Sequence, residues 1–266
     1  MSNNLSDIID SLISDSPSTE LTQVVKDLKQ ISTTHNITDD LELSLKKHDL
    51  FKFTPVQLPN GTKDRTIISK HNLKQGWFVD SLRGYKFQYD HLNRSVLQCE
   101  SIDKDDKLVQ LDAKIRPVLE SIYSDFYYIL IPSDEEDQDQ EVRLILKSIK
   151  LNNANFYNGE WTSEHLFDLE SSELLESKIK VDAHYYEDGN VRLIKESELS
   201  QAQKFSNGVT GLFDVIVDLE NSLQLDLNKS FVQLNENQFK KLRRLLPVTR
   251  SKVQWGKNVH NYKLNQ

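Results

Sequence analysis

The side chains most able to bind a partner are basic and gather at the C-terminal end of the sequence. Residues 237–266 contain eight basic residues and no acidic one. They are Lys240, Lys241, Arg243, Arg244, Arg250, Lys252, Lys257 and Lys263. The chain has 33 basic and 41 acidic residues, so residues 1–236 hold 25 basic residues against all 41 acidic ones, a charge of −16. This separation predicts that the C-terminal segment binds something negative. The alternative is a solvated basic helix end, which the helix dipole favours.

Histidine, cysteine and glycine, which commonly build active sites, form no such pattern here. The seven histidines are scattered, and no two are three to five residues apart, as a local zinc-ligand pair requires. Cys99 is the single cysteine, and the sequence contains no glycine-rich phosphate loop or nucleophile motif. We expect His91 and His184 to be structural and Cys99 to be a small buried apolar residue. The sequence therefore favours a protein that is not an enzyme and uses no cofactor or metal.

The sequence also indicates in which cellular compartment the protein is expected. It has no run of 18 apolar residues that could form a transmembrane helix. Residues 1–5 lack the basic and apolar parts of a signal peptide. A single cysteine permits no internal disulfide, which is typical of a reducing compartment. These features predict a cytoplasmic protein.

Residues 1–50 predict an N-terminal helical segment. Apolar residues recur at helical spacing in two stretches, which are Leu5, Ile8, Ile9, Leu12 and Ile13, then Leu21, Val24, Val25, Leu28 and Ile31. The sequence from Ser16 to Glu20 separates them, and a third helix is expected between Asn36 and Leu50. Short helices with short joints indicate an antiparallel helical layer.

Residues 51–125 predict a small β-rich middle region. Tyr85, Phe87 and Tyr89 alternate with polar residues, as in a half-buried strand. Towards the end of this region a helix is expected from Asp112 to Ser124. Pro117 would then lie near the first turn of this helix. Backbone N–H groups there have no acceptor within the helix, so the N–H that proline lacks costs no helical hydrogen bond.

Residues 126–246 predict an antiparallel sheet followed by a long helix. The expected strands are 126–132, 141–151, 156–167, 178–186 and 191–195, with a turn at Asn158-Gly159 inside the third. Residues 187–190 contain Asp-Gly and predict a hairpin turn, because these residues accept positive φ. Residues 134–141 hold six acids and no base, which indicates a loop. The fold class is α+β.

The apolar spacing from Ser206 to Leu246 predicts one long helix. About 40 residues at a rise of 1.5 Å would span about 60 Å, which is longer than a five-stranded sheet can cover. This length indicates a partner that extends the sheet. The alternative is a break in the helix near residues 235–237. Pro247 would end the helix, and residues 247–266 would form an amphipathic extension that docks on the body or projects from it.

Several ordered motifs resemble the alpha subunit of the heterodimeric F-actin capping protein. They are NFYNGEWTSE at residues 155–164, HYYEDGNV at 184–191 and FKKLRRLLPVTRSK at 239–252, with FVD at 78–80 and FQYDHL at 87–92. The resemblance covers roughly residues 50–262, and the third motif is highly specific. It implies an obligate heterodimer with a beta subunit, in which each subunit contributes five strands to one sheet. It also implies calcium-independent capping of the fast-growing (barbed) end of actin filaments, which blocks subunit exchange.

The resemblance places the main actin contacts on Lys240, Arg244 and Arg250. Lys240 and Arg244 are four residues apart and would share one helix face. Their basic neighbours Lys241, Arg243 and Lys252 would flank the site, although Arg243 could instead pair with the acidic body.

Slow release from a filament requires desolvated apolar contact as well as charge. We expect Val253, Trp255 and Val259 in the extension to supply that contact. The alternative for Trp255 is packing against the chain's own body.

Two other functions use the same basic residues. One is a binder of acidic lipid or nucleic acid, and the other is a non-enzymatic scaffold for a different acidic protein. A body with a charge of −16 would repel a nucleic-acid duplex, so no nucleic-acid partner is expected. The resemblance implies that acidic phosphoinositides compete at the basic patch, and it places the protein in cortical actin structures of the cytoskeleton.

Overall fold

The computed structural model describes residues 2–32, 35–59, 65–133, 141–152, 154, 156–185 and 191–233. By its internal contacts the chain divides into two units, Met1–Asn221 and Ser222–Gln266. The described part of the second unit is the helical stretch 222–233. The remaining described elements belong to the first unit.

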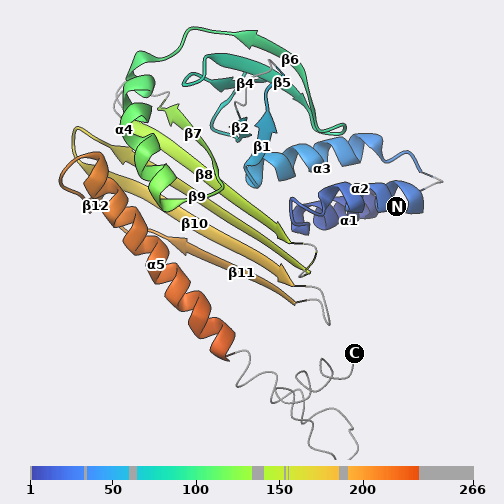
Figure 1. Cartoon of the computed structure of the whole chain (residues 1–266). Coiled ribbons are helices and arrows are strands. Elements are labelled where there is room, and N and C mark those ends of the chain that lie inside the picture. The colour runs from blue at the N-terminus through green and yellow to red at the C-terminus, as the bar shows by residue number, and fades with distance from the viewer. Residues whose placement is uncertain are drawn as a thin grey trace, which may run out of the picture. The chain divides into compact units, whose positions relative to one another are not determined.

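Three helices begin the chain, as the apolar spacing predicts. They are α1 (Ser2–Asp15), α2 (Leu21–Ile31) and α3 (Thr38–Phe51), and they lie side by side (Figure 1). Their shared core consists of Ile9, Ile13, Leu21, Leu28, Ile37, Leu41 and Leu45. The residues of each helix that enter this core recur every three or four positions, which is why a single face of each helix is buried.

The middle region contains two small antiparallel sheets. One is the hairpin of β1 (Thr54–Gln57) and β2 (Arg65–Ile68). The other runs in chain order through β3 (Leu73–Lys74), β4 (Trp77–Asp80), β5 (Tyr85–Asp90) and β6 (Ser95–Ser101). The predicted strand around Tyr85 is confirmed as β5. Cys99 on β6 is half-buried and packs against the apolar cluster around Phe78 and Phe87.

Helix α4 (Asp106–Ile122) begins six residues before the predicted start. Asp105 caps it, because its Oδ1 accepts the backbone N–H groups of Lys107 and Leu108 at 2.9 and 3.2 Å. The prediction that Pro117 lies near the first turn is therefore wrong, and Pro117 lies inside the helix. Asp105 is an N-cap residue whose carboxylate marks the true start of this helix, and the prediction did not use it.

The predicted five-stranded antiparallel sheet is confirmed. Its order is β11-β10-β9-β8-β7, with the short β12 (Gln203–Lys204) also paired to β10. Its strands are β7 (Tyr127–Pro132), β8 (Glu141–Asn152), β9 (Tyr157–Asp168), β10 (Glu173–Tyr185) and β11 (Val191–Glu198). Each of the five strands from β7 to β11 pairs with its neighbours in the sequence, so these five form a meander, and only β12 departs from it among the described strands. The predicted hairpin turn at residues 187–190 lies outside the described residues, but the strands on either side of it pair as expected.

The predicted turn at Asn158-Gly159 is wrong, because both residues lie within β9. Gly159 pairs with Lys150 on one side and Ala183 on the other. The Asn158 side chain donates to Glu20 Oε1 at 2.8 Å. Strand pairing on both sides overrides the local turn preference of Asn-Gly.

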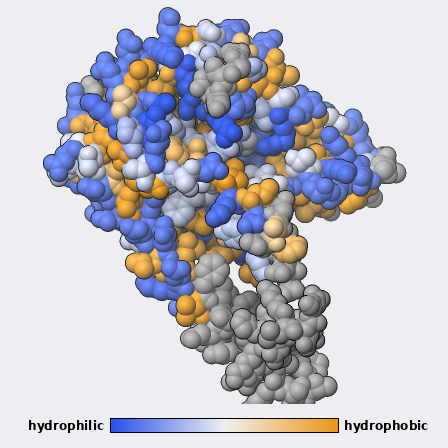
Figure 2. Space-filling view, viewed as in Figure 1, coloured by the Kyte–Doolittle hydropathy of each residue, from blue (hydrophilic) through white to orange (hydrophobic). Residues whose placement is uncertain are grey.

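The two faces of the sheet are covered by different elements. Leu144 and Leu146 on β8 belong to a core shared with α4 and with α5 (Val209–Gln233). Lys147 points to the opposite face, since successive side chains of a strand alternate, and there it donates to Ser18 of the N-terminal segment and to the backbone oxygen of Lys52. Figure 1 shows α4 and the part of α5 that belongs to the first unit, residues 209–221, running over one face of the sheet. In the same view the described surface is mostly hydrophilic, with apolar residues scattered over it (Figure 2).

Candidate functional site

All nine residues predicted to bind actin lie outside the described residues. They are Lys240, Lys241, Arg243, Arg244, Arg250, Lys252, Val253, Trp255 and Val259. The same is true of the predicted extension 247–266 and of the loop residues 134–140. The long helix predicted from Ser206 is described as α5 from Val209 to Gln233. The structure thus describes the scaffold that leads to the predicted site.

The first turns of α5 are anchored firmly on the sheet. Leu212, Phe213 and Ile216 are buried in the core beneath the helix. A side chain at Gly211 would place its Cβ 1.5 Å from the backbone oxygen of Ser206, so this position accepts only glycine. The start of the helix is therefore held by close packing.

A buried carboxyl group adds a polar contact further along α5. Tyr123 Oη donates to Glu220 Oε1 at 2.5 Å, and only 5% of Glu220 is exposed. Burial raises the pKa of Glu220, although the hydrogen bond from Tyr123 opposes that shift. This contact ties the helix to the residues just before the sheet.

The outermost strands of the sheet are β7 and β11, and no second strand adjoins either one among the described residues. On one face of β7, Ile129 and Ile131 pack with Ile67 of β2 in the middle region. At the other edge of the sheet, β11 pairs with β10. An unpaired strand edge presents backbone N–H and C=O groups that can pair with another chain. We call the outer side of β11, residues 191–198, the open edge.

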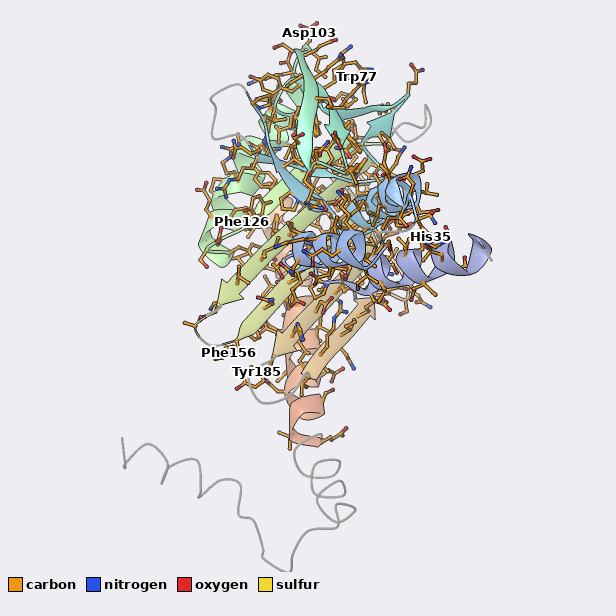
Figure 3. The ribbon with its side chains drawn as sticks, turned by 90° about the vertical axis from the view of Figure 1, so that its right-hand side faces the viewer. His35, Trp77, Asp103, Phe126, Phe156 and Tyr185 are labelled. Atoms are coloured by element: carbon orange, nitrogen blue, oxygen red, sulfur yellow. The ribbon has the colours of Figure 1, made fainter. Side chains whose placement is uncertain are left out.

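The side chains of the open edge leave apolar surface exposed. Lys180 pairs with Glu196 and Lys178 with Glu198 across the β10–β11 ladder. Between these neutralised charges and the hairpin end, Ile194 is 48% exposed and Val191 is 36% exposed. Aromatic side chains continue at the same end of the sheet, where Phe156 and Tyr185 lie (Figure 3). Exposed apolar residues on an unpaired edge are typical of an interface.

Arg192 fixes the open edge to the body of the chain. Its Nε and Nη2 donate to the two carboxylate oxygens of Asp182 at 2.8 and 2.6 Å. Its Nη1 donates to the backbone oxygen of Asp15, in the N-terminal segment. The bond to Asp182 raises the pKa of Arg192. A bidentate pair of this kind holds the strand in one geometry.

A chain of buried charges continues from Asp182 beneath the N-terminal helices. Lys52 Nζ binds Asp182 Oδ2 at 3.1 Å, and Lys147 Nζ donates to the backbone oxygen of Lys52 at 2.5 Å. Lys147 is fully buried and pairs with Glu160 at 3.1 Å. The Glu160 carboxylate also accepts the backbone N–H of Ser18 at 2.6 Å. We call Lys52, Lys147, Glu160 and Asp182 the buried ion chain.

The buried ion chain has the character of a structural joint. Burial lowers the pKa of Lys147. Burial alone would raise the pKa of Glu160, but Lys147 and Lys52 overcome it, and the pKa is lowered. The ionised form of Glu160 is therefore favoured, whereas burial disfavours the charge on Lys147 and the ion pair with Glu160 opposes that effect. Sequence reasoning missed this joint, although a lysine inside the apolar run Leu144–Ile149 is an available signal.

The histidines expected to be structural are bonded within the fold. His91 Nδ1 lies 2.8 Å from Asp49 Oδ2, and His184 Nδ1 lies 2.6 Å from Glu20 Oε1. His165 is buried with Nδ1 2.9 Å from Ser177 Oγ, and burial lowers its pKa to about 4. Over the described residues, no three histidine, cysteine or acidic side chains gather as a metal site. Nor does any described helix have the length and apolar character to span a membrane.

Comparison with known proteins extends the resemblance to nearly the whole chain. The family model for the F-actin capping protein alpha subunit matches residues 9–266, including residues 9–50, where the motifs showed no match. The F-actin-capping protein subunit alpha of Candida glabrata is 35% identical over 100% of this chain and 98% of its own length. The Saccharomyces cerevisiae subunit alpha is 34% identical over 100% of this chain and 97% of its own.

A solved structure shares the fold. The homodimeric actin capping protein alpha subunit from Plasmodium berghei superimposes with a TM-score of 0.72. The match covers 94% of this chain and 100% of that one at 17% identity. The arrangement of helices around an antiparallel sheet is therefore common to both proteins.

Proposed function

The chain belongs to the F-actin capping protein alpha subunit family, and from this membership we propose that it is the alpha subunit of a heterodimer that caps the barbed end of actin filaments. Capping would be independent of calcium and would block both addition and loss of subunits. The observation that carries the proposal is the match over residues 9–266, which spans the sheet, α5 and the basic segment together. The protein would act by binding alone, without catalysis or a cofactor.

The proposed partner is a capping protein beta subunit that joins the sheet. Support comes from the open edge, where Val191 and Ile194 are exposed and no second strand adjoins β11 among the described residues. Five strands from the partner would extend the sheet and shield the apolar side chains. A second copy of this chain is the other candidate, because the Plasmodium berghei relative is described as homodimeric.

The proposed actin site is the basic segment after α5. Lys240, Arg244 and Arg250 would make the main contacts with the acidic filament end, flanked by Lys241, Arg243 and Lys252. Exposed charges of this kind chiefly raise the association rate. Val253, Trp255 and Val259, in the extension 247–266, would then supply the apolar contact that slows release. Acidic phosphoinositides would compete for the same basic residues, and the complex would reside in the cytoplasm at cortical actin structures.

Seeded actin elongation tests this assignment. The triple variant Lys240→Ala, Arg244→Ala and Arg250→Ala is expected to weaken barbed-end capping by at least tenfold without disturbing the dimer. A matched control is Lys26→Ala, Lys29→Ala and Lys46→Ala, which removes the same charge from exposed positions of α2 and α3. Full capping by the first variant, or equal loss in both variants, would refute the site. Elongation from seeds whose barbed ends are already blocked reports on the pointed end alone, and so shows which end the protein caps.

A further inference from the structure

Three arginines from three separate elements line one cavity of the first unit. Arg65 comes from β2, Arg83 from the turn between β4 and β5, and Arg116 from α4. The cavity has a volume of about 200 Å³, and its other lining residues are Glu120, Phe126, Tyr127 and Tyr128. Phe126, labelled in Figure 3, marks its place at the start of β7. We call this cavity the arginine pocket.

The arginines are held in place by aromatic rings and by carboxylates behind them. The Arg65 guanidinium lies 5.2 Å from the centre of the Tyr127 ring, and Arg83 lies 5.2 Å from that of Tyr128. Arg83 is also paired with the buried Asp80 at 2.8 Å, and Arg116 with Asp112 at 2.8 Å. Stacking and ion pairing fix the guanidinium planes before any ligand arrives, which lowers the entropy lost on binding.

The two carboxylates are already engaged. Asp80 accepts hydrogen bonds from Thr66 and from the backbone N–H of Arg83, at 2.6 and 3.0 Å, in addition to its ion pair. Asp112 accepts the Tyr128 hydroxyl at 2.6 Å. Asp80 and Asp112 therefore orient the arginines and are not among the residues that line the cavity. Glu120 is the one carboxylate that lines the cavity in the described part of the chain.

The guanidinium groups keep donors for a further acceptor. Within the described residues, Arg65 donates through Nε to Gln57 and through Nη1 to Tyr127. Arg116 contacts Asp112 through Nε and Nη2. Arg83 donates through Nη1 to Asp80 and through Nη2 to the backbone oxygen of Tyr128. A guanidinium has five N–H donors, so each of the three arginines has donors beyond these bonds to the described residues. The Arg116 side chain is 52% exposed and the Arg83 side chain 12%, which leaves the pocket open to solvent.

From this geometry we infer that the arginine pocket binds a phosphate monoester. Three convergent guanidinium groups suit a compact anion with several oxygens and a charge near −2, because each can form charge-assisted bonds to a different oxygen. The rings of Phe126, Tyr127 and Tyr128 favour a phosphate carried on an apolar or aromatic group. None of the residues that line the pocket belongs to the proposed actin site, and the inference does not depend on that function.

Calorimetric titration of the purified full chain, in whatever complex it forms, tests the inference. The ligands are inorganic phosphate, phenyl phosphate and benzoate at constant ionic strength, together with vesicles with and without phosphatidic acid. We expect saturable binding of at least one phosphate monoester, and the ligand that binds best identifies the source as soluble or membrane-borne. Benzoate carries a single charge and should bind at least tenfold more weakly than phenyl phosphate.

Variants assign the binding to the pocket. Arg65→Gln and Arg116→Gln should each weaken it about tenfold, while Lys114→Gln, which removes the same charge from an exposed position on the same helix, should not. Glu120→Gln should strengthen binding, because it removes the negative charge from the wall. Arg83 is left unchanged, since it is mostly buried, also binds the backbone oxygen of Tyr128, and is the ion-pair partner of the fully buried Asp80. Absence of saturable binding, equal binding of benzoate, or equal loss in Lys114→Gln would overturn the inference.

Discussion

On one face of the central sheet Leu144 and Leu146 pack against α4 and α5, whereas on the other Lys147 and Glu160 form a buried ion pair beneath the N-terminal segment. On the apolar face, the removal of side-chain surface from water stabilises the fold, and many side chains of similar volume are tolerated there. The ion pair on the polar face adds little net stability, because the cost of desolvating the two charges offsets their attraction. It nevertheless requires one arrangement of the paired side chains. One sheet is thus held by the burial of apolar side chains on one face and by the specific geometry of an ion pair on the other.

The largest effect is expected from breaking the ion pair on the polar face. Lys147→Ala leaves Glu160 buried with its main partner removed, and should lower the free energy of unfolding by about 3–5 kcal/mol. Chemical denaturation of the purified protein measures it. The double variant Lys147→Met and Glu160→Leu should recover most of that loss. If the double variant is as unstable as the single one, the polar face is held by more than this pair.

A slightly smaller effect is expected from opening a cavity on the apolar face. Leu144→Ala should lower the free energy of unfolding by about 2–4 kcal/mol, because neighbouring side chains only partly refill the space. The same denaturation experiment applies, with Leu144→Met as the volume-conserving control, for which a loss below about 1.5 kcal/mol is expected. Equal losses for alanine and methionine would show that volume is not what matters at this position.

The two faces should respond to pH with opposite sign. Glu160 and Asp182 have lowered pKa values in the folded chain, so their contribution is present above their unfolded pKa values and is lost as the pH falls through the folded ones. Burial raises the pKa of Glu220 on the apolar face, so its ionisation costs stability as the pH rises through that raised value.

Two matched variants separate these effects in unfolding curves from pH 3 to 8. Glu160→Gln should destabilise at pH 7, and its difference from the native sequence should shrink below about pH 4. Glu220→Gln should stabilise at pH 7 with the hydrogen bond from Tyr123 kept, and its difference should also vanish at low pH. A destabilised Glu220→Gln variant at pH 7 would contradict the proposed cost of burying this carboxylate.

The smallest effect on stability is expected at the open edge, which belongs to neither packed face. Ile194→Lys should change the free energy of unfolding by less than about 0.5 kcal/mol, because the side chain is 48% exposed. It should nevertheless prevent association with a beta subunit or a second copy, measured by light scattering after size exclusion. Leu97→Lys on β6, at a side chain 61% exposed, is the control that should leave association intact.

The sequence alone determined the elements whose signals are local. Alternating polarity placed β5 and β10, and helical spacing placed α1 and α2, because side-chain periodicity follows directly from backbone geometry. A continuous apolar run placed the buried strand β7. It also determined the separation of charge and the motifs that resembled the family. It failed where a signal depends on neighbours, as at Asn158-Gly159, where strand partners on both sides overrode a local turn preference.

Only the tertiary structure decided which groups meet across long stretches of chain. Lys52 pairs with Asp182, 130 positions away, and Ser18 with Glu160, 142 positions away. No local sequence pattern predicts such pairs. The convergence of Arg65, Arg83 and Arg116 on one cavity and the exposure of apolar side chains on the outer strand β11 arise in the same way. The physical reason is that burial and pairing are properties of the assembled layers, whereas propensity and periodicity act within a few residues.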